Sequence, residues 1–357
     1  MCKVWLFFVH ALFRKSKTMN SRCLIVSIIC VLSYGLGAQT QMPNRDFEQW
    51  TPIGKGVALP KHWHSFGDGD CRLQGAYSWG CPQMLKHHSD RVRGHTGYGC
   101  EIFTTSIAGN IVNGVITTGQ TLFASPDGQS VENYNYTDKD NDSGNNAYMK
   151  FTGRPDSVYF WCKFEMKKSS VVAMAKFHLH GDVAYRDIAT HTSSTPQKGK
   201  IGNAFCELRN PGDHKWHQYK FKFTYYDEQN RVVKTSSRTP SYLLASFCTN
   251  KVIKSGNKGD KLIVDDIEMV YNKRLACLNV DGEHLPGFDP DRTEYSYYCD
   301  NNAPIPVFTA EAQSPNASVR VVQPTAENGF TARIVVNHDD GEQEYCVRVF
   351  RPLVADR

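Results

Sequence analysis

The sequence has 357 residues, of which 40% are hydrophobic, and this length is enough for two domains with at least one sizeable core. Its 41 Lys and Arg residues outnumber its 36 Asp and Glu residues, but five of the basic residues and none of the acidic ones lie in residues 1–38. Without that segment the balance is 36 against 36, so no surplus of positive charge remains to bind phosphates. This balance argues against nucleic-acid binding.

The first 38 residues are typical of a secretory leader. An apolar run of 14 residues, Cys23–Leu36, follows Arg22 and precedes the small residues Gly37 and Ala38. The run is too short for an ordinary transmembrane helix, so we expect a cleaved signal peptide and a chain that does not span the membrane. Met19 is an alternative start, and a lipid anchor at Cys30 is the alternative to cleavage.

Nine cysteines follow the leader, and their odd number leaves any disulfide connectivity open. They form no CxxC pair, which excludes a zinc ribbon and a thioredoxin-like motif. Cys162 and Cys206 lie in apolar strand contexts, where a buried free thiol is expected. In the C-terminal part, a bridge between two of Cys277, Cys299 and Cys346 is an open alternative.

Segments with period-two alternation dominate the chain after the leader, and no long amphipathic helix appears. Strands separated by turn residues, without helices between them, predict an all-β sandwich or jelly roll. Polar, turn-rich loops are expected over 125–147 and 198–202. The strand-like segments are 157–166, 171–181, 217–226, 241–248 and 262–271.

A second unit is predicted after Tyr271. Residues 272–274 form a short polar joint, and a new set of short strands fills 275–351. About 80 residues suit a small immunoglobulin-like sandwich. We therefore expect a leader over 1–38, a jelly-roll domain over 39–272 and a small β-sandwich domain over 273–357.

The strand over 262–271 contains two adjacent aspartates. Simple alternation places Asp265 on the same side as Ile263 and Ile267, and Asp266 on the opposite side. A carboxylate among core aliphatic groups is costly unless it is paired, hydrogen-bonded or bound to a metal. Asp265 is therefore the first candidate for a special role.

Two other strands carry unusual residues on their polar faces. Tyr159 and Trp161 lie on the polar face of 157–166, and Lys176, His178 and His180 lie on that of 171–181. If the two strands are neighbours, these side chains share one surface where a pyranose ring can stack on aromatics and bond at its edge. Coverage of Trp161 by a loop or by the second domain is the alternative.

Two further candidate sites are weaker. The spacing of His178, His180 and Asp182 permits zinc, although hydrogen-bonded histidines are the commoner explanation. Trp63, Tyr77 and Trp79 lie in a glycine-rich region and form either a glycan platform or packing beneath the loops. No G-x-S-x-G, P-loop or HExxH motif is present, and no two carboxylates are paired by sequence.

Residues 42–272 resemble the putative carbohydrate metabolism domain, a secreted jelly-roll family of glycan-using Gram-negative bacteria. The residues that carry the resemblance are, in order, NRDFEQW, LPKHWHSF, ITTG, FTGRPDSVYFWCKF and GDKLIVDDIEMVY. The ends of this region are also similar to carbohydrate-binding modules of the jelly-roll type. The second unit, with LPGFDPDRTEY and EYCVRVFRP, resembles a cadherin-like β-sandwich that serves as a spacer or interaction module in bacterial surface proteins.

The resemblance to jelly-roll modules implies a structural calcium ion between the first and last strands. Asp265 and Glu48 would supply carboxylate ligands, and backbone carbonyls near Asn44–Asp46 would supply others. The alternative is a carboxylate held by backbone N–H groups without a metal.

Together these features predict a secreted, non-catalytic glycan-binding protein of the periplasm or cell surface that assists carbohydrate acquisition. Its partner would be a polysaccharide or oligosaccharide, with a surface protein as a further partner for the C-terminal domain. A glycoside hydrolase and a structural or adhesive surface component are the alternatives. A hydrolase requires two carboxylates facing each other, whereas the adhesive alternative requires no glycan site.

Overall fold

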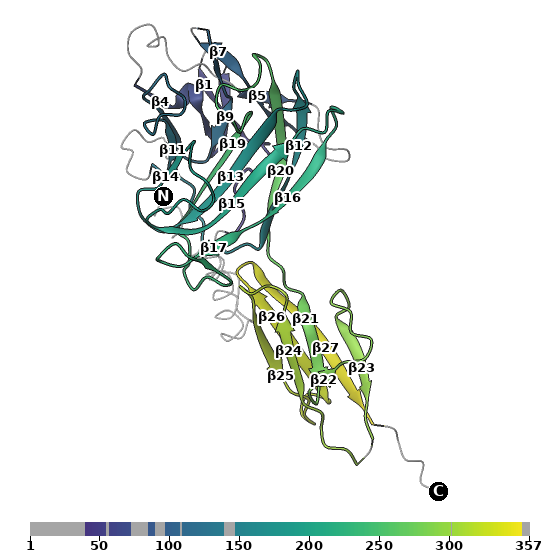
Figure 1. Cartoon of the computed structure of the whole chain (residues 1–357). Helices are drawn as coiled ribbons and strands as arrows, with labels where there is room; N and C mark the ends of the chain where they lie inside the picture. Colours follow the sequence, from purple (N-terminus) through teal and green to yellow (C-terminus); the bar gives the residue numbers. More distant parts are fainter. Residues whose placement is uncertain are drawn as a thin grey trace, which may run out of the picture. The chain divides into compact units, whose positions relative to one another are not determined.

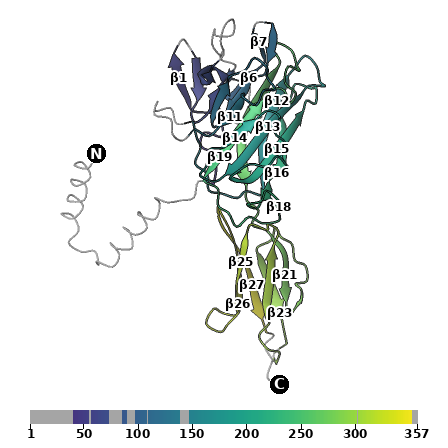
Figure 2. The same cartoon turned by 60° about the vertical axis from the view of Figure 1, so that its left-hand side comes forward.

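The computed structural model describes residues 40–54, 57–72, 85–89, 97–107, 109–138, 147–300 and 302–351. These residues form 27 strands and a single 3-10 turn at Phe66–Asp68 (Figures 1 and 2). The prediction of an all-β sandwich is confirmed. None of the helical structure within the described ranges is long and apolar enough to cross a bilayer. The leader lies outside the described residues.

Two large sheets form the first sandwich. The five-stranded sheet has the order β16-β12-β20-β6-β5, and the seven-stranded sheet has the order β18-β17-β15-β13-β19-β9-β3. The first contains β5 (Leu85–His88), β6 (Gly99–Phe103), β12 (Ser157–Glu165), β16 (His217–Lys222) and β20 (Lys261–Val270). The second contains β3 (His64–Ser65), β9 (Val115–Thr117), β13 (Val172–His180), β15 (Lys200–Arg209), β17 (Thr224–Tyr226), β18 (Val232–Val233) and β19 (Tyr242–Cys248).

Smaller sheets complete this region. A four-stranded sheet of order β14-β11-β10-β4 contacts the outer face of the seven-stranded sheet, for example through the ion pair of Asp187 with Lys176. Its strands are β4 (Asp70–Cys71), β10 (Gln120–Phe123), β11 (Tyr134–Tyr136) and β14 (Arg186–Ile188). Two hairpins are formed by β1 (Trp50–Gly54) with β2 (Val57–Pro60) and by β7 (Thr105–Ile107) with β8 (Asn110–Val112).

The C-terminal residues form a second pair of sheets, of order β22-β21-β24 and β23-β27-β26-β25. Their hydrophobic cluster, which includes Leu275, Phe308 and Tyr345, is separate from that of the first sandwich. The strands are β21 (Leu275–Val280), β22 (Glu283–His284), β23 (Glu294–Tyr298), β24 (Phe308–Ala312), β25 (Ser318–Val322), β26 (Thr331–His338) and β27 (Gly341–Phe350).

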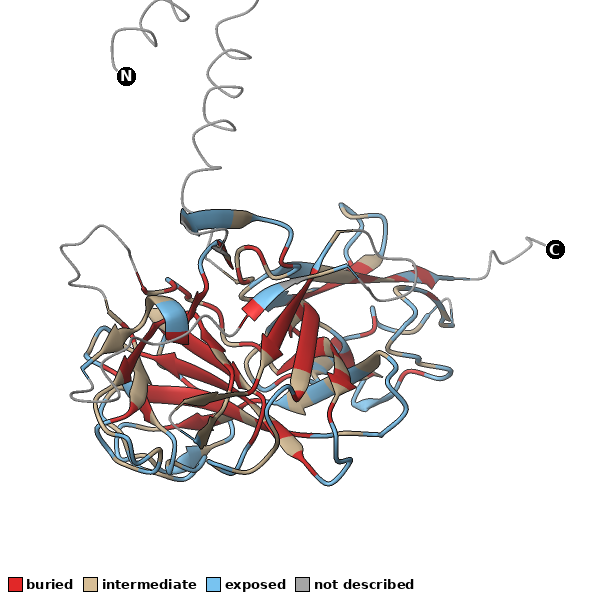
Figure 3. Ribbon diagram, turned by 90° about the horizontal axis from the view of Figure 1, so that it is seen from above, coloured by how far each residue is buried: buried red, intermediate tan, exposed pale blue. Residues whose placement is uncertain are grey.

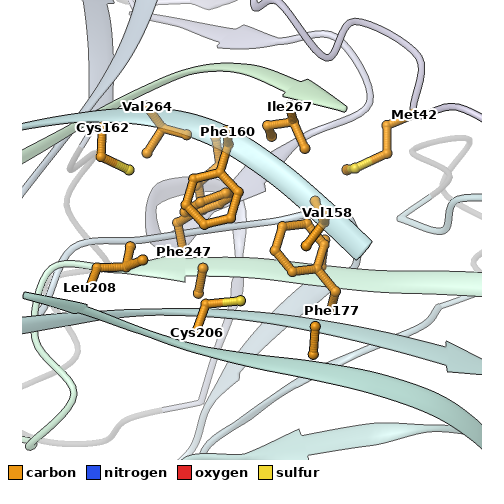
Figure 4. Close-up of a cluster of buried hydrophobic side chains, with 14 of the residues drawn as sticks. Met42, Val158, Phe160, Cys162, Phe177, Cys206, Leu208, Phe247, Val264 and Ile267 are labelled. Carbon is orange, nitrogen blue, oxygen red and sulfur yellow. The ribbon is translucent and has the colours of Figure 1, made fainter. Parts of the chain in front are cut away.

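The core of the first sandwich lies between its two large sheets. Val158, Phe160 and Cys162 of β12 point toward Phe177 of β13 and Phe247 of β19 (Figure 4). Figure 3 shows the same burial in red along the central strands. Cys162 and Cys206 are buried free thiols, as predicted. The other six described cysteines, including Cys277, Cys299 and Cys346, are also free thiols.

A bulge in β20 changes the face on which Asp265 lies. The pairing of β20 with β12 shifts between Tyr159 and Trp161, and Asp266 has a positive φ of 48°. The extra residue reverses the alternation, so Val264 and Ile267 both face the core while Asp265 lies opposite Trp161 on the outer face. The prediction that Asp265 lies on the apolar side was therefore wrong.

Candidate functional site

The predicted sugar-binding residues lie on two different faces. Strand β12, with Tyr159 and Trp161, belongs to the five-stranded sheet, whereas β13, with Lys176, His178 and His180, belongs to the seven-stranded sheet. Both sets point away from the shared core, so they are on opposite sides of the sandwich. The expected common surface does not exist, because the chain changes sheets between these two strands.

A cleft of about 170 Å³ lies on the outer face of the seven-stranded sheet. It is bounded by β13 and β19 on one side and by β8, β10, β11 and β14 on the other. Its lining combines aromatic and aliphatic side chains with amides, hydroxyls and one ion pair. The residues used below are Ile111, Tyr134, Asn135, Met174, Lys176, Asp187, Ser246, Asn250 and Ile253.

A buried ion pair forms part of the cleft wall. Lys176 Nζ lies 2.8 Å from Asp187 Oδ1, and the side chains are 10% and 4% exposed. Burial would raise the pKa of Asp187, but Lys176 and His178 outweigh it and hold that pKa well below its ordinary value. The lysine also lies over the ring of Phe205, 5.1 Å from its centroid. The Asp187 carboxylate is therefore held against the Lys176 ammonium group inside the wall.

The two predicted histidines are buried behind this pair. His178 forms a hydrogen bond of 3.2 Å between its Nδ1 and the Tyr185 hydroxyl. Its Nε2 lies 3.5 Å from Asp187 Oδ1. His180 bonds through Nε2 to Thr137 and through Nδ1 to the carbonyl of Gly181. Because both ring nitrogens of His180 have protein partners, the zinc alternative is not supported. The histidines hold the wall in place and do not line the cleft.

Of the three residues of the predicted loop platform, the structure describes only Trp63. Trp63 is 1% exposed and packs in the core against Phe47 and Phe247, with ring centroids 5.3 and 6.2 Å away. A residue this deeply buried cannot stack on a sugar, so its assignment to a binding site was wrong. Tyr77 and Trp79 lie outside the described residues.

The outer face of the five-stranded sheet carries a charged network beside the half-buried Trp161. Lys261 Nζ lies 3.5 Å from Glu101 and 3.1 Å from Glu165. Burial would raise the pKa of Glu165, but Lys261 and Lys163 lower it overall. His88, Glu101 and Glu165 lie close enough together to hold a metal ion, and Lys261 contacts both carboxylates of this group. This face also holds Tyr159, whose hydroxyl donates to Glu268.

Asp265 is buried in acidic surroundings on this same face. It is 2% exposed, and its Oδ1 accepts the backbone N–H of Asp266 at 2.9 Å. Burial, followed by the charges of Asp266, Glu48 and Asp46, raises the pKa of Asp265 to about 8. The N-terminal segment runs alongside, because Ile267 donates its N–H to the carbonyl of Arg45 at 3.0 Å.

Calcium is held by several hard oxygen ligands together, but among the described residues no three carboxylates of the acidic group around Asp265 place oxygens within 4.8 Å of one another. Asp265, Asp46, Glu48 and Asp266 offer hard carboxylate oxygens from two adjacent segments, and a divalent cation would relieve their mutual repulsion. Glu48 is exposed and accepts the N–H of Tyr98 at 2.7 Å through its Oε1. Asp266 belongs to this acidic group, contrary to the expectation that it faces away from Asp265.

Sequence reasoning did not single out Asp187, Tyr134 or Asn250 as site residues. Each lies in a short polar segment or loop that carries no periodic signal, and only the packing of β10, β11 and β14 against β13 and β19 brings them together. Of the predicted residues that the structure describes, Lys176 alone lines the cleft.

No protein-family model matches the chain, and no curated protein matches it. Among solved structures, it is similar to a Bacteroides thetaiotaomicron protein named "putative glycoside hydrolase", with a TM-score of 0.43 and 12% identity over 66% of this chain and 72% of that chain. A Bacteroides vulgatus protein, also named "putative glycoside hydrolase", gives a TM-score of 0.42 and 14% identity. The match covers 66% of this chain and 98% of that chain.

A third solved structure, TmCBM61 in complex with β-1,4-galactotriose, gives a TM-score of 0.28 and 10% identity over 63% of this chain and 94% of that chain. All three TM-scores are below 0.5, so these likenesses carry no argument about what the chain does. Membership of the putative carbohydrate metabolism domain family and the cadherin-like assignment stay predictions.

Proposed function

We propose that this protein is a secreted, non-catalytic glycan-binding protein whose binding site is the cleft on the outer face of the seven-stranded sheet. The observation that carries the proposal is the composition of the cleft. Tyr134 and the aliphatic wall offer surfaces for the C–H face of a pyranose, while Asn135, Ser246 and the fixed Lys176–Asp187 pair offer donors and acceptors for its hydroxyls.

The carboxylates favour binding over hydrolysis. Asp187 is the only carboxylate among the described residues that line the cleft, and glycoside hydrolysis requires two. On the outer face of the five-stranded sheet, Lys261 bridges Glu101 and Glu165, and the lowered pKa of Glu165 is the opposite of what a general acid needs. The carboxyl group on that face whose pKa is raised is Asp265, which is only 2% exposed and so is closed to a substrate.

The other parts of the proposal rest on the sequence and on the acidic group around Asp265. The leader supports export to the periplasm or the cell surface of a Gram-negative bacterium. A calcium ion held by Asp265, Glu48 and their neighbours would tie the N-terminal segment to β20 and act structurally. The C-terminal sandwich would serve as a spacer or as the contact to a surface protein.

A glycan array followed by calorimetric titration tests the proposed site. Tyr134→Ala removes an aromatic surface from the cleft and is expected to weaken binding by about fivefold, since an aromatic contact contributes on the order of 1 kcal/mol. Tyr298→Ala is the matched control, because Tyr298 is 72% exposed on the second sandwich. Release of reducing ends from any bound glycan would favour the hydrolase alternative instead. Retention of no glycan on the array would overturn the proposal.

A further inference from the structure

A histidine and two glutamates from three different strands meet on the outer face of the five-stranded sheet. His88 is the last residue of β5, Glu101 lies in β6 and Glu165 is the last residue of β12. Each offers one ligand atom, and these three atoms all lie within 4.8 Å of one another. Within the described ranges of the chain, no other three His, Cys, Asp or Glu residues form such a group.

The spacing of this group suits a small divalent metal ion. His88 Nε2 lies 3.5 Å from Glu101 Oε2 and 4.0 Å from Glu165 Oε1. In a tetrahedral zinc site with bonds of about 2.0–2.2 Å, neighbouring ligand atoms are about 3.3–3.6 Å apart. Rotation of the side chains closes this small difference, so metal binding requires no rearrangement of the strands.

The Glu101 carboxylate is incompletely satisfied by the protein. Glu101 is 1% exposed, and its Oε1 has no hydrogen-bond partner in the part of the chain that the structure describes. Lys86 Nζ lies 3.2 Å from this oxygen without forming a hydrogen bond, and the lysine side chain is 59% exposed. A buried charged oxygen in this state is costly, and a metal ion that binds the carboxylate removes the cost.

Two further lysines are the competing cations at this group. Lys261 Nζ lies 3.5 Å from Glu101 and 3.1 Å from Glu165. Lys163 Nζ lies 3.4 Å from Glu165. These contacts are longer than the about 2.7–2.9 Å of a strong hydrogen bond between charged groups. Partly exposed ion pairs contribute little to stability, and a lysine can turn its ammonium group toward water on a flexible stem, so a metal ion can displace it.

From this geometry we infer that His88, Glu101 and Glu165 bind zinc. The imidazole nitrogen decides between metals, because zinc accepts imidazole and carboxylate ligands together whereas calcium takes oxygen ligands. The side chains of His88 and Glu165 are 16% and 32% exposed, so one side of the ion faces solvent and a water molecule completes its coordination.

The ion joins parts of the sheet that are not adjacent. Strand β5 is the edge strand, and β6 and β20 separate it from β12. A zinc ion held by all three residues therefore ties the edge strand to the middle of the sheet. The site lies on the opposite side of the sandwich from the cleft, so it does not depend on glycan binding there.

Isothermal titration of the whole protein, first freed of metal with a chelator, tests the inference. Zinc chloride is expected to bind at this site, and calcium chloride should not compete with it. His88→Gln removes the imidazole and is expected to weaken zinc binding by more than about tenfold. His284→Gln is the matched control, because His284 is exposed on β22 of the second sandwich. Absence of zinc binding, or zinc binding that His88→Gln leaves unchanged, would overturn the inference.

A second variant distinguishes a metal site from a network of ion pairs. Lys261→Met removes a competing ammonium group and is expected to tighten zinc binding by about fivefold or more, since a positive charge beside a divalent ion is repulsive. Thermal unfolding provides the check on folding. Zinc should raise the melting temperature of wild type but not that of His88→Gln, and both should melt alike with chelator. Zinc affinity that Lys261→Met leaves unchanged or lowers would contradict displacement of the lysine.

Discussion

Asp187 and Asp265 are both almost fully buried on outer faces of the first sandwich, but their surroundings differ in sign. Lys176 lies 2.8 Å from Asp187, and together with His178 it holds the pKa of that carboxyl group well below its ordinary value. Asp265 is surrounded by Asp266, Glu48 and Asp46, and its pKa is raised to about 8. One site is balanced by the protein, whereas the other has an excess of negative charge.

The difference separates two uses of a buried carboxylate. A balanced pair fixes the wall of a cleft, since a charge with a good partner keeps one geometry and attracts no further ion. An unbalanced group of carboxylates is stable only if it takes up a proton or a cation. The two faces should therefore respond differently to mutation and to calcium.

The largest expected effect comes from breaking the balanced pair. Lys176→Met leaves the Asp187 carboxylate buried without its main partner. Asp187→Asn leaves the Lys176 ammonium group buried without a carboxylate partner. Each change is expected to lower the free energy of unfolding by about 3–5 kcal/mol, as measured by urea denaturation. The double variant Lys176→Met with Asp187→Leu is the control, because an apolar pair of similar volume should restore most of the stability. Single variants with near wild-type stability would show that the pair is not buried as described.

The same pair fixes the direction of the acid response. Because the pKa of Asp187 is lower in the folded protein than in the unfolded chain, its contribution is fully present above the unfolded value of about 3.9. This stabilising contribution of Asp187 is lost as the pH falls from about 3.9 toward the lower pKa that Asp187 has in the folded protein. Wild type should therefore lose stability relative to the double variant only below about pH 4.

The next effect concerns the unbalanced group. If calcium binds Asp265 and its neighbours, it should stabilise the folded protein by about 2.7 kcal/mol at a hundredfold excess over its Kd. Asp265→Asn should remove most of this dependence, as measured by thermal unfolding with calcium and with a chelator. Glu283→Gln, on the exposed strand β22, is the control. An identical melting temperature of wild type in both buffers would rule out the calcium site.

The smallest effect is expected for Trp161→Ala. Trp161 and the cleft lie on opposite sides of the sandwich, so the change should alter the glycan affinity of the cleft by less than about twofold. Titration with the best ligand from the array measures this. A complete loss of binding in a folded Trp161→Ala protein would transfer the binding site to the five-stranded sheet.

The sequence by itself determined the fold class. Period-two alternation, turn residues and the absence of long amphipathic segments predicted an all-β sandwich, and strands such as Ser157–Glu165 and Lys200–Arg209 follow from that local pattern. It also singled out Lys176 and Asp265 as candidate site residues, although it placed Asp265 on the core face of its strand. Local patterns suffice here because the faces of a strand alternate wherever its pairing is regular.

Only the tertiary structure decided where these residues lie. The assignment of β12 and β13 to different sheets depends on pairing between segments far apart in the chain, and it separated Trp161 from Lys176. One extra residue at the bulge moved Asp265 to the other face of β20. The partner of Lys176 comes from β14, a three-residue strand with no periodic signal. Pairing, register and the choice of charged partner arise from contacts across the fold, and local alternation carries no information about them.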